Sequence, residues 1–147
     1  MTDEEFQKNL RIGTEAEDKV YAWLKSHYSF VQDMRYQTHN KGTGPRLDGL
    51  GGSVILPDFA YYDKVRGNYL LDVKYKSRNF FTVDEYKMRD YLKAVDLLGM
   101  DGLLLVFVYE NDMYFYDSLE KQGPVTFNNA YGTSAYTFRF DKLKIKK

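Results

Sequence analysis

Residues 54–76 read VILPDFAYYDKVRGNYLLDVKYK, and this stretch decides the fold. Residues 54–62 and 69–76 are both rich in β-branched and aromatic side chains, and the turn DKVRGN separates them. Two such runs on either side of a turn predict a β-hairpin. Pro57 interrupts the first run, which predicts an edge or a bulge there, because proline has no N–H to give to a strand ladder.

The second run places its polar side chains on one side of a strand. Side chains alternate along a strand, so Asp72 and Lys74 point the same way, while the opposite face is apolar or aromatic. Asp58 lies across the hairpin, where it can approach Asp72. Two carboxylates that converge in a cleft repel each other unless a cation lies between them. Oxygen ligands of this kind suit Mg²⁺ or Mn²⁺.

The N-terminal residues 3–27 have the pattern of an amphipathic helix. Positions on one stripe recur at spacings of three and four, and they are Phe6, Leu10, Gly13, Val20 and Leu24. On a helical wheel Glu17 falls in the middle of this stripe. An acid that faces the protein needs a partner or a metal ion. Glu17 is therefore a third candidate site residue.

The other segments predict elements around the hairpin. Thr82 and Glu85 have capping-box spacing, which predicts a second helix from Thr82 to Gly99. The apolar run 103–109 predicts a strand covered on both faces. Weaker patterns predict strands within 29–37, 113–116 and 136–140, a flexible glycine-rich loop over 38–53 and a frayed basic tail over 142–147.

These elements predict a single α/β domain (α+β mixed) over residues 1–147, with a central mixed sheet flanked by helices. The chain has no cysteine, which excludes a disulfide framework and a thiolate metal site. Its formal net charge is zero, which argues against a general nucleic-acid coat protein. It shows no secretory signal and no apolar run long enough to span a bilayer. We expect a soluble intracellular protein that does not bind membranes.

Pro57-Asp58 followed by Asp72-Val73-Lys74 resembles the PD-(D/E)XK nuclease superfamily. The wider pattern resembles its Holliday-junction-resolvase branch, whose members carry a glycine and, four residues later, a glutamate in the first helix, as Gly13 and Glu17 do here. A flexible loop before the PD strand and a helix and an apolar strand after the second motif complete the likeness. The resemblance covers about residues 10–109 and implies a restriction-endonuclease-like core.

The resemblance also implies a mechanism. It implies a Mg²⁺-dependent nuclease, with Mn²⁺ as a substitute, that hydrolyses phosphodiester bonds in DNA. Asp58 and Asp72 would hold the ion together with the backbone carbonyl of Val73, and Glu17 would complete the site directly or through water. Lys74 would orient the attacking water and offset charge in the transition state.

Polar residues near these positions are candidates for DNA contacts, and they are Lys76, Arg78, Lys41, Arg46, Thr38 and His39. No recognition helix or zinc module is visible, so we expect the enzyme to recognise the shape of branched or structured DNA. A four-way junction needs two symmetric cuts, which favours a homodimer. The expected location is the cytoplasm of a prokaryote or of a virus-infected cell, and the small size favours a viral enzyme.

Two other functions stay open. The first is a simpler nuclease of the same fold, such as an exonuclease, a nicking enzyme or a repair enzyme. The second is a non-catalytic DNA-binding or assembly protein. Taken without Asp58 and Glu17, the Asp72–Lys74 pair is also what an ordinary solvated strand face contains.

Overall fold

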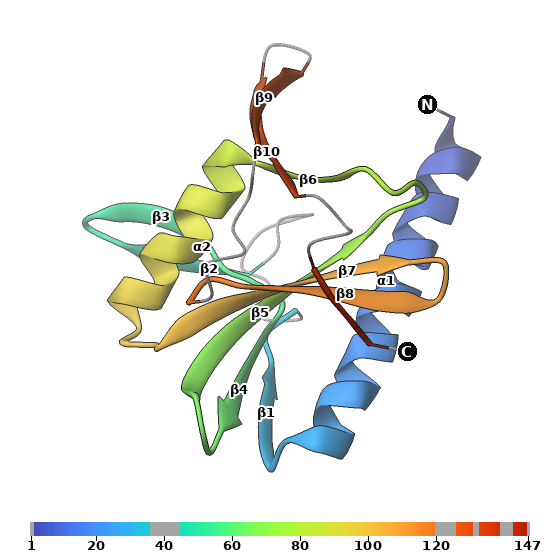
Figure 1. Ribbon diagram of the computed structural model, residues 1–147. Helices are drawn as coiled ribbons and strands as arrows, with labels where there is room; N and C mark the ends of the chain where they lie inside the picture. The colour runs from blue at the N-terminus through green and yellow to red at the C-terminus, as the bar shows by residue number, and fades with distance from the viewer. Residues whose placement is uncertain (1, 36–44, 120–125, 131–132, 139–142, 147) are drawn as a thin grey trace.

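The computed structural model describes residues 2–35, 45–119, 126–130, 133–138 and 143–146 (Figure 1). A central sheet has the strand order β1-β4-β5-β7-β8-β11. Its strands are β1 (Phe30–Asp33), β4 (Phe59–Asp63), β5 (Gly67–Tyr75), β7 (Gly102–Tyr109), β8 (Asp112–Asp117) and β11 (Lys144–Lys146). The β5–β7 pair is parallel and the other pairs are antiparallel. The predicted mixed sheet is therefore confirmed, as is the hairpin that β4 and β5 form.

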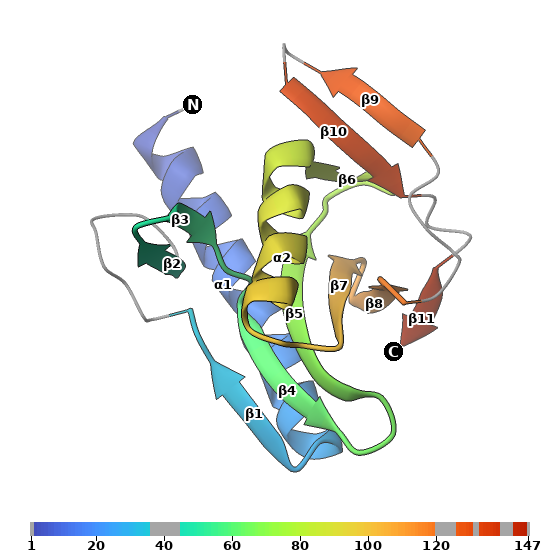
Figure 2. The ribbon, with the colours of Figure 1, turned by 90° about the vertical axis from the view of Figure 1, so that its left-hand side faces the viewer.

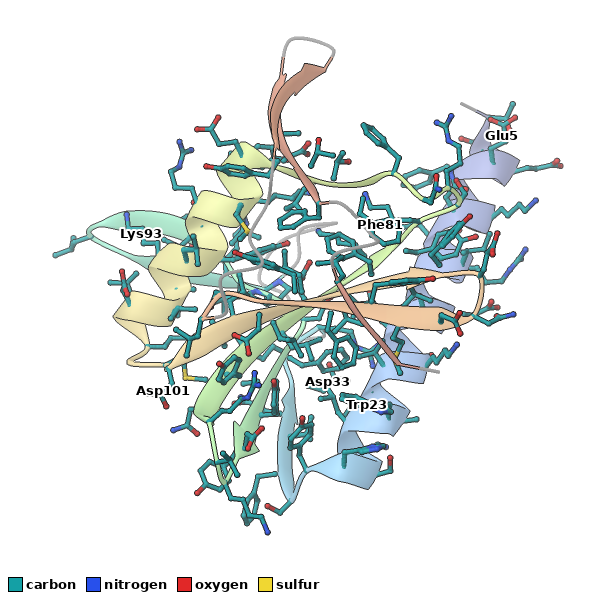
Figure 3. The ribbon with its side chains drawn as sticks, viewed as in Figure 1. Glu5, Trp23, Asp33, Phe81, Lys93 and Asp101 are labelled. Atoms are coloured by element: carbon teal, nitrogen blue, oxygen red, sulfur yellow. The ribbon has the colours of Figure 1, made fainter. Side chains whose placement is uncertain are left out.

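Helices α1 (Asp3–His27) and α2 (Glu85–Leu97) pack on opposite faces of this sheet (Figure 2). Each face has its own apolar cluster. On the α1 face, Ala16, Val20 and Leu24 pack with alternate residues of β5 and β7. The other residues of these strands pack against α2 on the second face. Figure 3 shows the two layers, with Phe81 above the sheet and Trp23 below it.

Strand β7 is covered on both faces, as its apolar sequence predicts. All its residues from Gly102 to Val108 are buried, because β5 and β8 flank it and an apolar cluster covers each face. Strand β5 is buried from Tyr69 to Val73. Asp72 therefore lies within the buried stretch of β5 rather than on a solvated strand face, and Lys74 lies half-buried at the end of that stretch.

Helix α1 spans the predicted residues, but its predicted packing is wrong in its first half. Thr2 caps the helix and forms a capping box with Glu5. Phe6 and Leu10 are each 51% exposed, because the N-terminal half of the helix extends past the sheet (Figure 1). The apolar stripe is buried from Ala16 onward.

The second helix begins later than predicted. Residues Phe81–Asp84 form strand β6, which pairs with β10 (Thr133–Phe138), so no capping box joins Thr82 to Glu85. Pairing with β10 and burial of alternate side chains make the strand more stable here than an extension of the helix would be. Gly99 follows the end of α2 with φ +66°, as the predicted helix stop requires.

Two further predictions are wrong. Within the predicted loop over 38–53, β2 (Arg46–Gly49) pairs with β3 (Gly52–Ile55) in a hairpin, while residues 36–44 lie outside the described part of the chain. The tail, expected to fray, contains β11, which gains backbone hydrogen bonds by pairing with β8. The remaining strand, β9 (Thr126–Ala130), extends a small sheet with the order β6-β10-β9. Among the described residues, no helix is both long enough and apolar enough to cross a bilayer.

Candidate active site

The strand predicted over 54–62 is broken, and the break positions the candidate site. Strand β3 ends at Ile55 and β4 begins at Phe59, so Pro57 and Asp58 lie between them. The ladder between β4 and β5 ends at the pair Phe59–Leu71, and β5 continues beyond it. The Val73 N–H, past the end of the ladder, donates to Asp58 Oδ2 at 2.9 Å. The side chain of Asp58 thus supplies the acceptor that this buried backbone group needs.

Asp72 and Lys74 lie on the same face of β5, as predicted. Lys74 Nζ is 3.0 Å from Asp72 Oδ2, and it also donates to the Tyr91 hydroxyl of α2 at 3.2 Å. Asp72 is 3% exposed, and within the described residues its Oδ2 has no well-aligned hydrogen bond besides its ion pair with Lys74. A buried carboxylate oxygen that meets a single cation has unused capacity to bind a second one.

The carboxylates of Asp58, Asp72 and Glu17 are close enough to affect one another. Burial raises the pKa of Asp58 well above its usual value, and the charges of Asp72 and Glu17 raise it further. Burial disfavours the charge on Lys74, but the charges and hydrogen bonds of Asp72 and Tyr91 together outweigh this effect and raise the lysine's pKa. Burial and mutual repulsion therefore favour a proton on Asp58 unless a cation compensates its charge, and Lys74 is a fixed cation beside Asp72.

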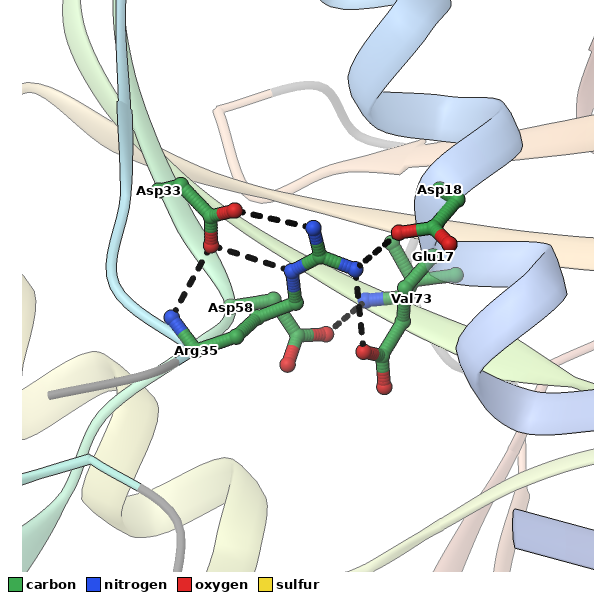
Figure 4. Close-up of polar contacts among 6 residues, drawn as sticks. All are labelled: Glu17, Asp18, Asp33, Arg35, Asp58 and Val73. Carbon is green, nitrogen blue, oxygen red and sulfur yellow. Dashed lines mark hydrogen bonds and ion pairs between the residues drawn. The ribbon is translucent and has the colours of Figure 1, made fainter. Parts of the chain in front are cut away.

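Arg35 is a residue of this region that sequence reasoning missed. Its guanidinium lies between β1 and α1, where it bonds Asp33, Asp18 and Glu17 (Figure 4). The arginine side chain is 6% exposed. Its contact with Glu17 is the longest of the three at 3.4 Å. Arg35 therefore tethers Glu17 beside the site.

Glu17 comes from the middle of α1, where its carboxylate meets Arg35 and feels the charge of Asp72 on β5. Its pKa is raised by burial, although the charge and the hydrogen bond of Arg35 act against the rise. The nearby charge of Asp72 adds to it. The structure thus brings the three predicted acids into one electrostatic group, with Glu17 bound to an arginine.

A cleft of about 930 Å³ opens between the first half of α1 and the residues from Val73 to Thr82. Val73 and Lys74 are the site residues that line it, whereas Glu17, Asp58 and Asp72 do not. Lys74, Lys76 and Arg78 all line it. Lys76 Nζ donates to the Thr82 carbonyl at 2.8 Å, and burial together with the charge of Lys74 lowers the pKa of Lys76 to about 8. Two of the candidate DNA contacts therefore lie in the cleft that leads to Lys74.

The other candidate contacts are not gathered there. Arg46 is in β2, where its guanidinium donates to the Ser53 hydroxyl of β3 at 3.2 Å, and it does not line the cleft. Thr38, His39 and Lys41 lie outside the described residues. Lys8 and Asn9 of α1 line the cleft, although no sequence pattern marked them.

The carboxylates of Asp58 and Asp72 fit a divalent ion that keeps part of its water shell. Across the described ranges, no group of three or more acidic, histidine or cysteine side chains is arranged to hold a metal ion. A Mg²⁺ site needs fewer, because the ion keeps several waters and binds through one or two carboxylates plus substrate phosphate. Asp58 and Asp72, with an unused lone pair on the buried Asp72 Oδ2, fit that smaller requirement.

Comparisons with known proteins do not assign this site. No protein-family model matches the chain, and no curated protein sequence matches it.

Proposed function

We propose that this protein is a divalent-metal-dependent endodeoxyribonuclease that hydrolyses phosphodiester bonds in branched or structured DNA, on a restriction-endonuclease-like core. One observation carries the proposal. Asp58, Asp72 and Lys74 lie close together where β5 extends beyond the end of its pairing with β4. The buried Asp72 Oδ2 is paired there with a single cation, the ammonium group of Lys74. A carboxylate pair with an adjacent lysine, beside a cleft lined by cations, suits the hydrolysis of a phosphodiester.

Asp58 and Asp72 would hold Mg²⁺, or Mn²⁺ in its place, together with the Val73 carbonyl. When bound, such an ion lowers the pKa of a water and polarises a phosphate oxygen. Lys74 stays charged beside Asp72, so it can orient the nucleophile and offset negative charge in the transition state. Glu17, tethered by Arg35, would act through water.

Substrate binding would depend on Lys76 and Arg78, which line the cleft and would contact phosphate groups there. Phosphate contacts position a duplex without reading its sequence, so the shape of a branch would determine which substrate is cut. Two cuts across a junction need two sites, so we further propose a homodimer that works inside a cell.

The test is cleavage of a labelled four-way junction compared with linear duplex of the same sequence, in Mg²⁺ and in EDTA. Paired symmetric cuts at the junction that disappear in EDTA are the expected result. Equal cutting of both substrates would support a nuclease and overturn the junction preference. No cutting of DNA in Mg²⁺ or Mn²⁺ would overturn the proposal and favour a non-catalytic binding protein.

A further inference from the structure

Two aromatic side chains line the cleft beside the candidate active site and are exposed. Tyr75, the last residue of β5, is 45% exposed, and Phe80, just before β6, is 53% exposed. Neither belongs to an apolar cluster of the described residues, whereas the next residue, Phe81, is fully buried. Large rings left open to solvent within a cleft suit a ligand that has a flat apolar surface.

Positive charge surrounds these rings. Lys8, Lys74, Lys76 and Arg78 line the cleft, and Glu5 is the acidic side chain among the lining residues. Glu5 is at the far end of α1 (Figure 3), and its carboxylate accepts a hydrogen bond from the Thr2 N–H within the helix cap. The cleft therefore combines aromatic faces with a net positive charge.

This combination distinguishes between two forms of DNA. In a duplex, the base faces are stacked on each other and closed to protein side chains. An unpaired strand presents both a base face and a phosphate at each nucleotide, which is why sites for single strands pair aromatic rings with cations. The rings of Tyr75 and Phe80 can therefore stack on the bases of an unpaired strand, whereas the bases of a continuous duplex are closed to them.

We propose that the cleft binds an unpaired segment of a DNA strand, with bases stacked on Tyr75 and Phe80 and phosphates held by Lys8, Lys76 and Arg78. The segment would pass beside Lys74 toward Asp72, so the inference rests on the proposed nuclease function. It narrows the substrate to structured DNA that has an unpaired stretch next to the cut, such as a fork, a flap or an opened junction.

The test measures binding without chemistry. A fluorescein-labelled single strand of mixed sequence and its matching duplex are titrated with the protein in EDTA, and anisotropy gives the affinity. We expect the single strand to bind more tightly. Tyr75→Ala and Phe80→Ala should each weaken single-strand binding by at least about fivefold, while Tyr75→Phe and Phe80→Tyr restore it because they keep a ring.

Phe30→Ala is the matched control. Phe30 is a 71% exposed ring on the edge strand β1, outside the cleft, so its removal should leave the affinity unchanged. All these side chains are exposed, and thermal melting of each variant verifies that it folds. Equal affinity for single strand and duplex, or wild-type affinity in both alanine variants, would overturn the inference.

The two proposals fail separately. Junction cleavage that is unaffected by Tyr75→Ala and Phe80→Ala would overturn the cleft assignment and leave the nuclease intact. Ring-dependent binding of the single strand by a protein that never cuts DNA would support the cleft assignment and overturn hydrolysis.

Discussion

The Asp58 carboxylate accepts a hydrogen bond from the Val73 N–H at 2.9 Å, across the point where β4 and β5 stop pairing. Its orientation is therefore fixed by the backbone of the neighbouring strand. An asparagine at this position keeps an acceptor oxygen for Val73 but carries no charge. Asp58→Asn thus separates the electrostatic role of this residue from its role in holding the two strands together.

Without metal, we expect Asp58→Asn to be more stable than the wild type at about pH 8. The pKa of Asp58 is raised in the folded state, so the folded protein binds more protons than the unfolded chain between the ordinary and the raised value. The stability contributed by this residue is full below the ordinary pKa and falls as pH rises through the raised one. Thermal melting in EDTA from about pH 4 to pH 8 measures the effect. Identical pH dependence in both proteins would contradict it.

Added Mg²⁺ should reverse this order. Saturating metal at about 100 times its dissociation constant stabilises a protein by about 2.7 kcal/mol, which corresponds to several degrees of melting temperature for a chain of this size. The wild type should gain this shift and Asp58→Asn should lose most of it. Equal shifts in the two proteins would place the ion elsewhere.

Asp72→Asn should abolish cleavage and leave DNA binding largely intact. Losing a metal ligand removes several kcal/mol of transition-state stabilisation, so the rate should fall at least about a hundredfold. Binding depends on the cations of the cleft, which this change leaves in place. Single-turnover cleavage of a junction and anisotropy in EDTA measure the two properties. Cleavage at the wild-type rate would exclude Asp72 from the site.

Lys74→Ala should lower the cleavage rate by about two to three orders of magnitude while Mg²⁺ still binds. The ammonium group lies 3.0 Å from Asp72 Oδ2, so its removal leaves both carboxylates available to the metal. Isothermal titration with Mg²⁺ and single-turnover kinetics test the two parts. Lys93→Ala, a change on the exposed side of α2, is the matched control. Loss of metal binding in Lys74→Ala would show that the lysine has a structural role instead.

Arg35→Ala should cost about 3 kcal/mol of folding stability. The arginine is almost fully buried and bonds Asp33 through two nitrogen atoms, at 3.0 and 2.8 Å. Removing one partner of a buried ion pair leaves the other charge without compensation. Urea unfolding measures the loss, and Arg46→Ala, whose partner is the exposed Ser53, should change little. A similar small effect in both variants would show that Arg35 does not hold α1 to β1.

Gly67→Ala should destabilise the β4–β5 hairpin by about 1–3 kcal/mol. Gly67 has φ +100°, a conformation that alanine rarely adopts, and a Cβ there would collide with the carboxylate of Asp101. That carboxylate cannot move freely, because it accepts a hydrogen bond from the Asn68 N–H at 2.8 Å. Gly51→Ala, at an exposed turn with open space around it, is the control, and its urea midpoint should shift less.

The elements that sequence predicts well are those whose signal lies within one segment. Helix α1, the β4–β5 hairpin and the buried β7 each have a local periodicity or composition that determines them. Strand β6 does not, because the ladder that stabilises it comes from β10, some fifty residues later in the chain. The same reason applies to β11, whose basic sequence resembles a solvated tail until it pairs with β8.

The candidate site likewise contains residues that the sequence predicts and residues that it does not. Asp58, Asp72 and Lys74 are predictable, because a strand places alternate side chains on one face and a hairpin brings two strands together. Arg35 is not, because an arginine in a polar stretch gives no sign that it will be buried between a helix and a strand. The cleft was also missed, because it exists only where the exposed half of α1 lies opposite the end of β5.

The overhang of α1 beyond the sheet has a consequence for how the molecule assembles. The helix is attached to the sheet by its second half, so its first half becomes a wall of the cleft only after β5 and β7 have paired and formed the surface on which Ala16 and Val20 rest. The pairing of β5 with β7 is parallel and spans the whole of β6 and α2, a type of contact that forms late in folding. We therefore expect the α1 wall of the cleft to form later than the local β4–β5 hairpin, which already brings Asp58 and Asp72 onto neighbouring parts of the chain.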